Sequence, residues 1–115
     1  RIGTALGAKP ETFFGLSGLG DLVLTCTGEL SRNRQFGIRV GQGEKPQDIA
    51  NDMKVAVEGF LTLKSAYALK SKLKIQASII DETYKVIYEG KSPHQALKDL
   101  MQIKTTSEFI GIKGI

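Results

Sequence analysis

The sequence has few of the features that mark a secreted or membrane-bound chain. Its only cysteine, Cys26, excludes an intramolecular disulfide framework and a cysteine-based zinc site, which fits a reducing, cytoplasmic setting. No apolar run approaches the roughly 20 residues that a helix needs to cross a bilayer, so we expect no membrane partner. The chain begins at Arg1 with neither an initiator Met nor a signal-peptide pattern, and we interpret it as a fragment or a processed product.

The composition is otherwise typical of a folded domain. The 115 residues are 41% hydrophobic and 24% charged, which excludes disordered and collagen-like chains and predicts one compact domain. A formal net charge of +4 mildly favours anionic partners. We interpret the lysine-rich stretch 64–74 as a solvated helix face and expect no nucleic-acid binding.

Hydrophobic periods predict two long helices in the second half. The ranges 60–73 and 77–89 each place their apolar residues on one side. Gly90 then stands where a helix end favours a left-handed residue. The polar residues expected on the outer face of the second helix are Asp81, Glu82 and Lys85.

A third helix is predicted to begin after Gly90. Ser92 is its expected N-cap, Pro93 suits the first helical position, and Gln95 completes a capping box. The helix should end near Ile103. We therefore divide the chain into a helical domain, 1–103, and a C-terminal tail, 104–115, which has no clear period.

The elements predicted for the first half of the chain are shorter. Pro10 opens a short helix through Phe14, and a second short helix starts at Pro46. The range 21–27 is either a β-prone strand or a buried helix. The range 31–40 is a helix with Ser31 as N-cap. Because no strand–helix alternation repeats, we predict an all-α, multi-helix fold.

The most informative motif is Ser31-Arg32-Asn33-Arg34. A helix N-terminus carries partial positive charge and unpaired N–H groups, so two arginines there are unfavourable unless an anion lies among them. A phosphate group would satisfy both the helix end and an Arg fork. The alternative is two solvated arginines, paired with Glu29 or another surface acid.

Asp21 is a second candidate, because it lies between flexible glycines and the apolar run 22–24. A carboxylate in apolar surroundings needs a charged partner or a raised pKa, and such groups are common at active sites. The alternative is a helix-start Asp that only favours the dipole. Glu58 is a loop acid or a helix-start charge. We expect His94 to be a surface residue and Cys26 a small buried hydrophobe.

The run Gly-Leu-Gly-Asp-Leu-Val-Leu-Thr-Cys-Thr at 18–27, followed by Ser-Arg-Asn-Arg at 31–34, resembles a known family. It is similar to the C-terminal domain of bacterial-type NAD(P)-dependent glycerol-3-phosphate dehydrogenase. Further matches lie at 7–13, 57–59 and 87–90, and the resemblance covers about residues 1–102. It implies a fold like the C-terminal domain of 6-phosphogluconate dehydrogenase.

The resemblance also implies an activity and a set of site residues. The family reduces dihydroxyacetone phosphate to sn-glycerol 3-phosphate with NADH or NADPH, and the product feeds glycerophospholipid synthesis. An N-terminal Rossmann domain holds most of the cofactor. The implied substrate-binding residues are Asp21, which supports catalysis, Thr25, Ser31, Arg32 and Asn33. The implied cofactor-binding residues are Arg32, Ala56 and Glu58.

The departure from the family pattern is that the cofactor domain and the catalytic lysine, which lies upstream of the motif, are missing from the sequence. We therefore expect the isolated chain to be inactive. Its expected partners are a small phosphorylated substrate, its own N-terminal Rossmann domain and a second copy in a homodimer. The alternative is a stand-alone helical module that binds phosphate esters or proteins without catalysis.

Overall fold

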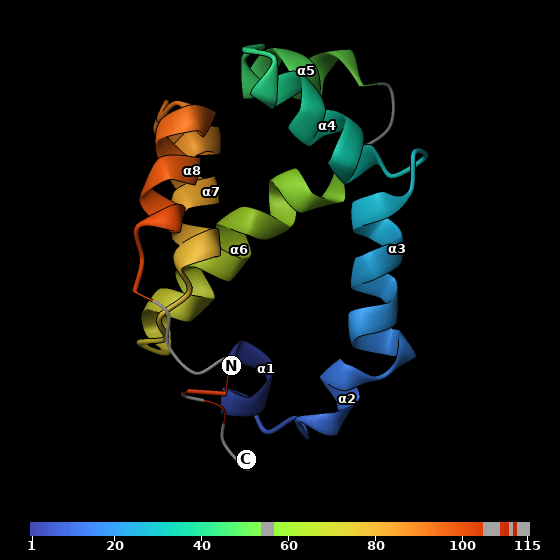
Figure 1. Cartoon of the computed structure of the whole chain (residues 1–115), viewed down its shortest axis with the longest axis vertical. Helices are drawn as coiled ribbons and strands as arrows, with labels where there is room; N and C mark the ends of the chain where they lie inside the picture. Colours follow the sequence, from blue (N-terminus) through green and yellow to red (C-terminus); the bar gives the residue numbers. More distant parts are fainter. Residues whose placement is uncertain (54–56, 105–108, 111, 113–115) are drawn as a thin grey trace.

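The computed structural model describes residues 1–53, 57–104, 109–110 and 112, and within them every regular element is helical (Figure 1). The all-α prediction is confirmed. The elements are α1 (Ile2–Ala5), α2 (Glu11–Phe14), a π-helical turn η1 (Leu16–Gly20), α3 (Asp21–Thr27), α4 (Arg32–Gly41), α5 (Pro46–Asp52), α6 (Glu58–Lys72), α7 (Ser78–Tyr88) and α8 (Pro93–Met101).

The helices form two groups joined by α4. On one side α7 packs between α6 and α8, and on the other side α2, η1 and α3 follow one another (Figure 1). The joining helix α4 contacts α3 at one end and α5, α6 and α8 along its length. The position of α4 therefore decides how the two groups meet.

The ambiguous range 21–27 forms the helix α3, so the strand alternative is wrong. The hydroxyl of Thr27 donates to the carbonyl of Val23 at 2.7 Å, a bond within the helix. Gly28 ends α3 in an extended conformation, and a Cβ there would lie 2.8 Å from the carbonyl oxygen of Leu24. A short apolar run is compatible with either a strand or a helix. In the structure this range packs as a helix against η1 and α4.

The predicted start of α8 is confirmed except for its capping box. Gly90 has a φ of +75°, and the Ser92 hydroxyl accepts from the backbone N–H of Gln95 at 3.1 Å. The Gln95 side chain instead donates to Asp99, one turn further along the helix, at 2.7 Å. The helix ends at Met101 rather than near Ile103.

The hydrophobic core lies where α4, α5, α6 and α7 meet. Its buried residues are Phe36, Val40, Ile49 and Val57. Ile49 is fully buried, at 0% exposure, and is the anchor of the short helix α5. A half-buried layer that includes Phe60 and Val86 packs against this cluster. The core therefore holds α4 against the beginning of α6.

Five aromatic rings extend this core along α6 and α7. Phe36 on α4 contacts Phe60, whose ring contacts Tyr88, with centroids 5.7 and 5.4 Å apart. Tyr88 is followed by Tyr84 at 4.9 Å, and Tyr84 stacks on Tyr67 at 3.9 Å. The Tyr88 hydroxyl donates to the carbonyl of Phe60, and burial raises the pKa of this tyrosine. The row ties the start of α6 to the end of α7.

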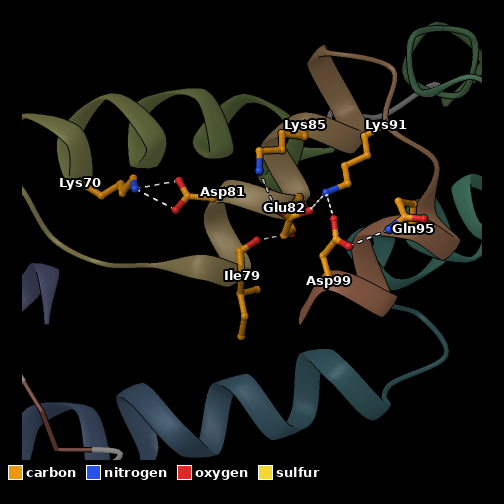
Figure 2. A network of polar contacts seen from close by, with 9 residues as sticks. Lys70, Ile79, Asp81, Glu82, Lys85, Lys91, Gln95 and Asp99 are labelled. Atoms are coloured by element: carbon orange, nitrogen blue, oxygen red, sulfur yellow. Dashed lines mark hydrogen bonds and ion pairs between the residues drawn. The ribbon is translucent and has the colours of Figure 1, made fainter. Parts of the chain in front are cut away.

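The expectation that Glu82 faces outward is wrong, because its side chain is buried at 8% exposure (Figure 2). Its carboxylate accepts from Lys85 at 2.6 Å and from Lys91, which also binds Asp99 on α8. The hydrogen bonds from Lys85 and Lys91 lower the pKa of Glu82, and those from Lys91 and Gln95 lower the pKa of Asp99. Hydrophobic periodicity missed this because it assigns every charge to the surface.

Asp81 is only half-buried and forms an ion pair with Lys70 of α6 at 2.7 Å (Figure 2). This pair joins the outer edges of α6 and α7. The lysine-rich face of α6 is therefore not wholly solvated.

The α2–η1–α3 arm, residues 11–27, leaves much of its apolar surface open. Leu16 is 90% exposed and Leu24 is 70% exposed. Cys26 is also exposed, so the expectation of a buried cysteine is wrong. The arm contacts the rest of the described chain mainly through α4, which leaves most sides of α3 uncovered.

Replacing Ile49 with Ala should lower the free energy of unfolding by about 2–5 kcal/mol, because it leaves a cavity at a fully buried position. Ile79 is 72% exposed, so the matched Ile79→Ala variant should change this free energy by less than about 0.5 kcal/mol. Denaturant unfolding of both variants measures the difference. Equal effects would contradict the assignment of the core.

The Lys91 bridge should give the stability of the α7–α8 pair a specific pH dependence. The folded pKa values of Glu82 and Asp99 lie below their ordinary values of 4.5 and 3.8, so their contribution is complete above those values. It is lost as the pH falls through the lower folded values. The melting temperature should therefore drop between pH 6 and pH 3.

Lys91→Met removes the shared cation, so it should lower the melting temperature at pH 6 and flatten its acid dependence. Lys98 of α8 is exposed and has no ion pair among the described residues, so Lys98→Met is the control. An unchanged acid dependence in Lys91→Met would show that the bridge contributes nothing.

Candidate functional site

An open hollow of about 640 Å³ lies where α3, α4 and α6 meet. Its walls come from the end of α3, the loop between α3 and α4, and the first residues of α4 and α6. The lining residues are Leu24, Thr25, Gly28, Glu29, Leu30, Ser31, Arg32, Asn33 and Glu58. Five of the seven residues implied by the family resemblance are among them.

The loop between α3 and α4 is fixed by backbone and side-chain bonds. The Ser31 N–H donates to the carbonyl of Gly28 at 3.1 Å, and the Gln35 side chain donates to the carbonyl of Glu29 at 2.9 Å. The Ser31 hydroxyl accepts from the N–H of Arg34 at 3.3 Å, which confirms Ser31 as the N-cap. The start of α4 is thus held in place beside the hollow.

Arg32 occupies the first position of α4, in a first turn that contains no acidic residue. It lines the hollow, whereas Arg34 does not. Within the described ranges neither arginine forms an ion pair, and the pairing with Glu29 that we considered is not formed. A guanidinium therefore lies at a helix N-terminus without an ion pair, an arrangement suited to an anion.

Arg39, on the same helix, shows the opposite arrangement. Its guanidinium donates to Glu44 at 2.6 Å and to Asp52 at 2.7 Å. The hydrogen bonds to Glu44 and Asp52 raise the pKa of Arg39 above its ordinary value. This arginine has its partners within the chain and joins α4 to α5, whereas Arg32 is left available for a ligand.

Glu58 is the first residue of α6 and lies on the same hollow, exposed to solvent. The Oδ1 of Asn33 accepts from the backbone N–H of Gly59 at 3.1 Å, so the start of α4 contacts the start of α6. Glu29 lines the loop side. The carboxylates are acceptors for ligand hydroxyl groups, whereas Arg32 is a donor for an anion. Neither Glu29 nor Gly59 was a sequence-derived candidate.

Thr25 is half-buried on α3 and lines the hollow. Asp21 lies one turn earlier on the same helix, is exposed, and does not line it. The expectation that apolar side chains enclose Asp21 is wrong, because its neighbours from 22 to 24 are themselves exposed. Ala56 lies outside the described residues.

Neither His94 nor a metal-ligand cluster forms a site among the described residues. His94 is exposed in the first turn of α8, as predicted for a surface residue. Across the ranges that the structure describes, no three His, Cys, Asp or Glu side chains are arranged to hold a metal ion. In the same ranges no helix has the length and apolarity needed to cross a membrane.

A second hollow, of about 390 Å³, lies between α4, α6, α7 and α8 and is mostly apolar. It shares Asn33 with the first hollow, and its charged residue, Glu82, is already paired with lysines. The first hollow is lined by Arg32, which forms no ion pair among the described residues, and we assign the candidate site there.

The chain is similar to known proteins. Residues 1–98 match the family model described as NAD-dependent glycerol-3-phosphate dehydrogenase C-terminus. The chain is 50% identical, over 110 residues and 96% of its length, to glycerol-3-phosphate dehydrogenase [NAD(P)+] of Citrifermentans bemidjiense. It is 50% identical, over 108 residues and 94% of its length, to the protein of the same name from Desulfotalea psychrophila.

A solved structure is also similar. The crystal structure of glycerol-3-phosphate dehydrogenase from Coxiella burnetii superposes with a TM-score of 0.86 at 36% sequence identity. The match covers 90% of this chain and 32% of that one. The chain likewise spans 33% of the length of the Citrifermentans protein and 32% of the Desulfotalea protein. The similarity thus concerns about one third of each relative.

Proposed function

Because the chain belongs to the family of the NAD-dependent glycerol-3-phosphate dehydrogenase C-terminus, we propose that it is the substrate-binding part of such an enzyme. The complete enzyme would reduce dihydroxyacetone phosphate to sn-glycerol 3-phosphate with NADH or NADPH, in the cytoplasm, and supply glycerophospholipid synthesis. The rest of the enzyme would then include a Rossmann domain and the catalytic lysine, and a chain that spans 33% of a relative leaves room for both.

The observation that carries this proposal is the unpaired Arg32 at the N-terminus of α4. The phosphate of the substrate lies against its guanidinium and the first N–H groups of the helix, a common binding mode for phosphates. The Nδ2 group of Asn33 has no partner among the described residues and is a further donor. Ser31 caps the helix and so orients these groups.

Asp21 and Thr25 act at the other end of the substrate. They are four residues apart on α3, so they lie on one face of the helix, with Thr25 at the hollow. Thr25 donates to or accepts from the substrate. Asp21 belongs to the polar network that orients the lysine of the complete enzyme.

The cofactor, NADH or NADPH, supplies the hydride when it is bound. Two residues at the hollow fit part of this cofactor. The Arg32 guanidinium suits a phosphate, and the Glu58 carboxylate suits a ribose hydroxyl. The resemblance adds Ala56 as an apolar or backbone contact. These groups are too few to hold a whole dinucleotide, so the isolated chain should be inactive and the Rossmann domain should hold most of the cofactor.

The exposed apolar surface of the α2–η1–α3 arm supports a need for further protein. Single exposed hydrophobic residues are ordinary, but here Phe14, Leu16, Leu19 and Leu24 are all at least half exposed within eleven residues. Contacts with the rest of the enzyme and with a second copy in a homodimer would cover such a surface. Sedimentation at several concentrations tests the dimer, and a monomer throughout would contradict it.

The second candidate function is binding of phosphate esters without catalysis. The hollow is built entirely from residues of this chain, so it needs no other segment to present Arg32. Calorimetric titration of the isolated chain with sn-glycerol 3-phosphate measures such binding. The two functions are distinguished by whether the protein with its natural upstream region oxidises NADH or NADPH.

Arg32→Ala should raise the KM for dihydroxyacetone phosphate about 10- to 100-fold in the complete enzyme, since charge-assisted bonds to the phosphate are lost. Arg34→Ala removes the same charge from the same turn without touching the hollow, and it should change the KM less than about threefold. Steady-state kinetics of both variants measures the two KM changes. Equal effects would show that only the net charge matters.

Asp21→Asn should lower kcat of the complete enzyme about tenfold or more while leaving the melting temperature nearly unchanged, because an exposed side chain contributes little to folding. Asp48→Asn, an exposed acid in the first turn of α5, is the matched control. An unfolded Asp21→Asn protein, or an unchanged kcat, would contradict the catalytic role.

A further inference from the structure

Gly59 is the second residue of α6, and its backbone conformation does not explain why it is glycine. It lies within a regular helix, where glycine is disfavoured relative to alanine. Its φ is not in the left-handed region, unlike that of Gly7, Gly43 and Gly90. The reason for a glycine here therefore lies in its surroundings.

The surroundings are the side chain of Asn33. A Cβ on Gly59 would lie 2.6 Å from the Oδ1 of Asn33, closer than such atoms approach, and 3.0 Å from its Cγ, so the end of the Asn33 side chain would have to shift. The same approach lets the Gly59 N–H donate to that Oδ1 at 3.1 Å. Gly41, on α4, has open space at its Cβ position. The absence of a side chain at Gly59 thus permits a bond between residues 26 positions apart.

This bond lies next to two of the three charged residues of the candidate site, Arg32 and Glu58. Asn33 follows Arg32 in the first turn of α4, and Gly59 follows Glu58 in the first turn of α6. Behind them, the buried Val57 and Phe36 pack in the same core cluster. The bond therefore joins the two helix starts between the two hollows: Asn33 lines both of them, and Gly59 lines the apolar one.

We propose that Gly59 is a positioning residue, which through its contact with Asn33 sets the separation of Arg32 and Glu58. This inference rests on the proposed function, in which Arg32 holds the substrate phosphate and Glu58 holds the cofactor. Gly59 has no side chain with which to contact either ligand. A change at Gly59 should therefore alter the binding of both ligands by displacing the two helix starts.

The kinetic test uses the protein with its natural upstream region and follows NADH or NADPH consumption. Gly59→Ala should raise the KM for dihydroxyacetone phosphate and the KM for the cofactor, each on the order of fivefold to tenfold, as expected when one hydrogen bond is lost. The control Gly41→Ala should leave both constants unchanged. An unchanged pair of KM values in Gly59→Ala would overturn the proposal, whatever the effect of Asn33→Ala, because Asn33 also donates to the phosphate directly.

A melting experiment tests the contact without reference to activity. Gly59→Ala should lower the melting temperature in the wild-type background, because the new Cβ displaces the Asn33 side chain. In the Asn33→Ala background the same substitution should raise it, since alanine is the better helix former and nothing remains to collide. Lowering by the same amount in both backgrounds would overturn the contact.

Asn33→Asp provides the conservative rescue. Its carboxylate keeps an oxygen acceptor for the Gly59 N–H at a helix N-terminus, so the melting temperature should stay near the wild-type value. A loss equal to that of Asn33→Ala would contradict the bond. If the wild-type protein oxidises neither cofactor, the proposed function and the positioning role both fail, and the melting experiment still decides whether the contact exists.

Discussion

Arg32 stands in the first turn of a helix that carries no acid there, and it forms no ion pair with any described residue. A cation at this end of a helix opposes the dipole, so the folded chain bears a small electrostatic cost that an anion would remove. Several local hydrogen bonds fix the start of α4. The Ser31 cap, the turn at Gly28 and the Asn33 contact to α6 all hold the start of α4 beside the hollow.

The interactions that stabilise the fold lie away from this site. Arg39 joins α4 to α5, and the Lys91 bridge joins α7 to α8 (Figure 2). Buried Phe36 and Ile49 hold α4 and α5 in the core. These elements satisfy their own charges, so most interactions that stabilise the fold involve residues outside the hollow, and the bond between Asn33 and Gly59 is the exception. Variants at the hollow should therefore change affinity more than folding.

Short-range chemistry explains what the sequence predicted correctly. The Ser31 and Ser92 caps and the left-handed Gly90 depend on residues within four positions, and all three are confirmed. The burial of Glu82 depends on Lys91, nine residues away across a helix end, so helical periodicity could not detect it. For α3, an apolar run of a few residues fits a strand or a helix equally well until its neighbours are placed.

At the candidate site, too, the sequence predicts local features and misses contacts between distant residues. The sequence alone predicts Arg32 as an anion-binding residue, because arginines at a helix start are visible in the local sequence, and the structure places it at the hollow. The contact between Asn33 and Gly59 joins residues far apart, and only the structure brings them together. The exposure of Asp21 was missed because apolar neighbours in sequence are not neighbours that cover it.

The central claim is that the hollow beside Arg32 recognises the phosphate of a three-carbon substrate in a reduction by NADH or NADPH. The most direct test follows cofactor consumption by the protein with its natural upstream region, with dihydroxyacetone phosphate and then with unphosphorylated dihydroxyacetone. The account predicts rapid oxidation of the cofactor with the phosphorylated substrate and almost none without the phosphate. Equal rates with both, or no oxidation by a well-folded protein, would contradict it.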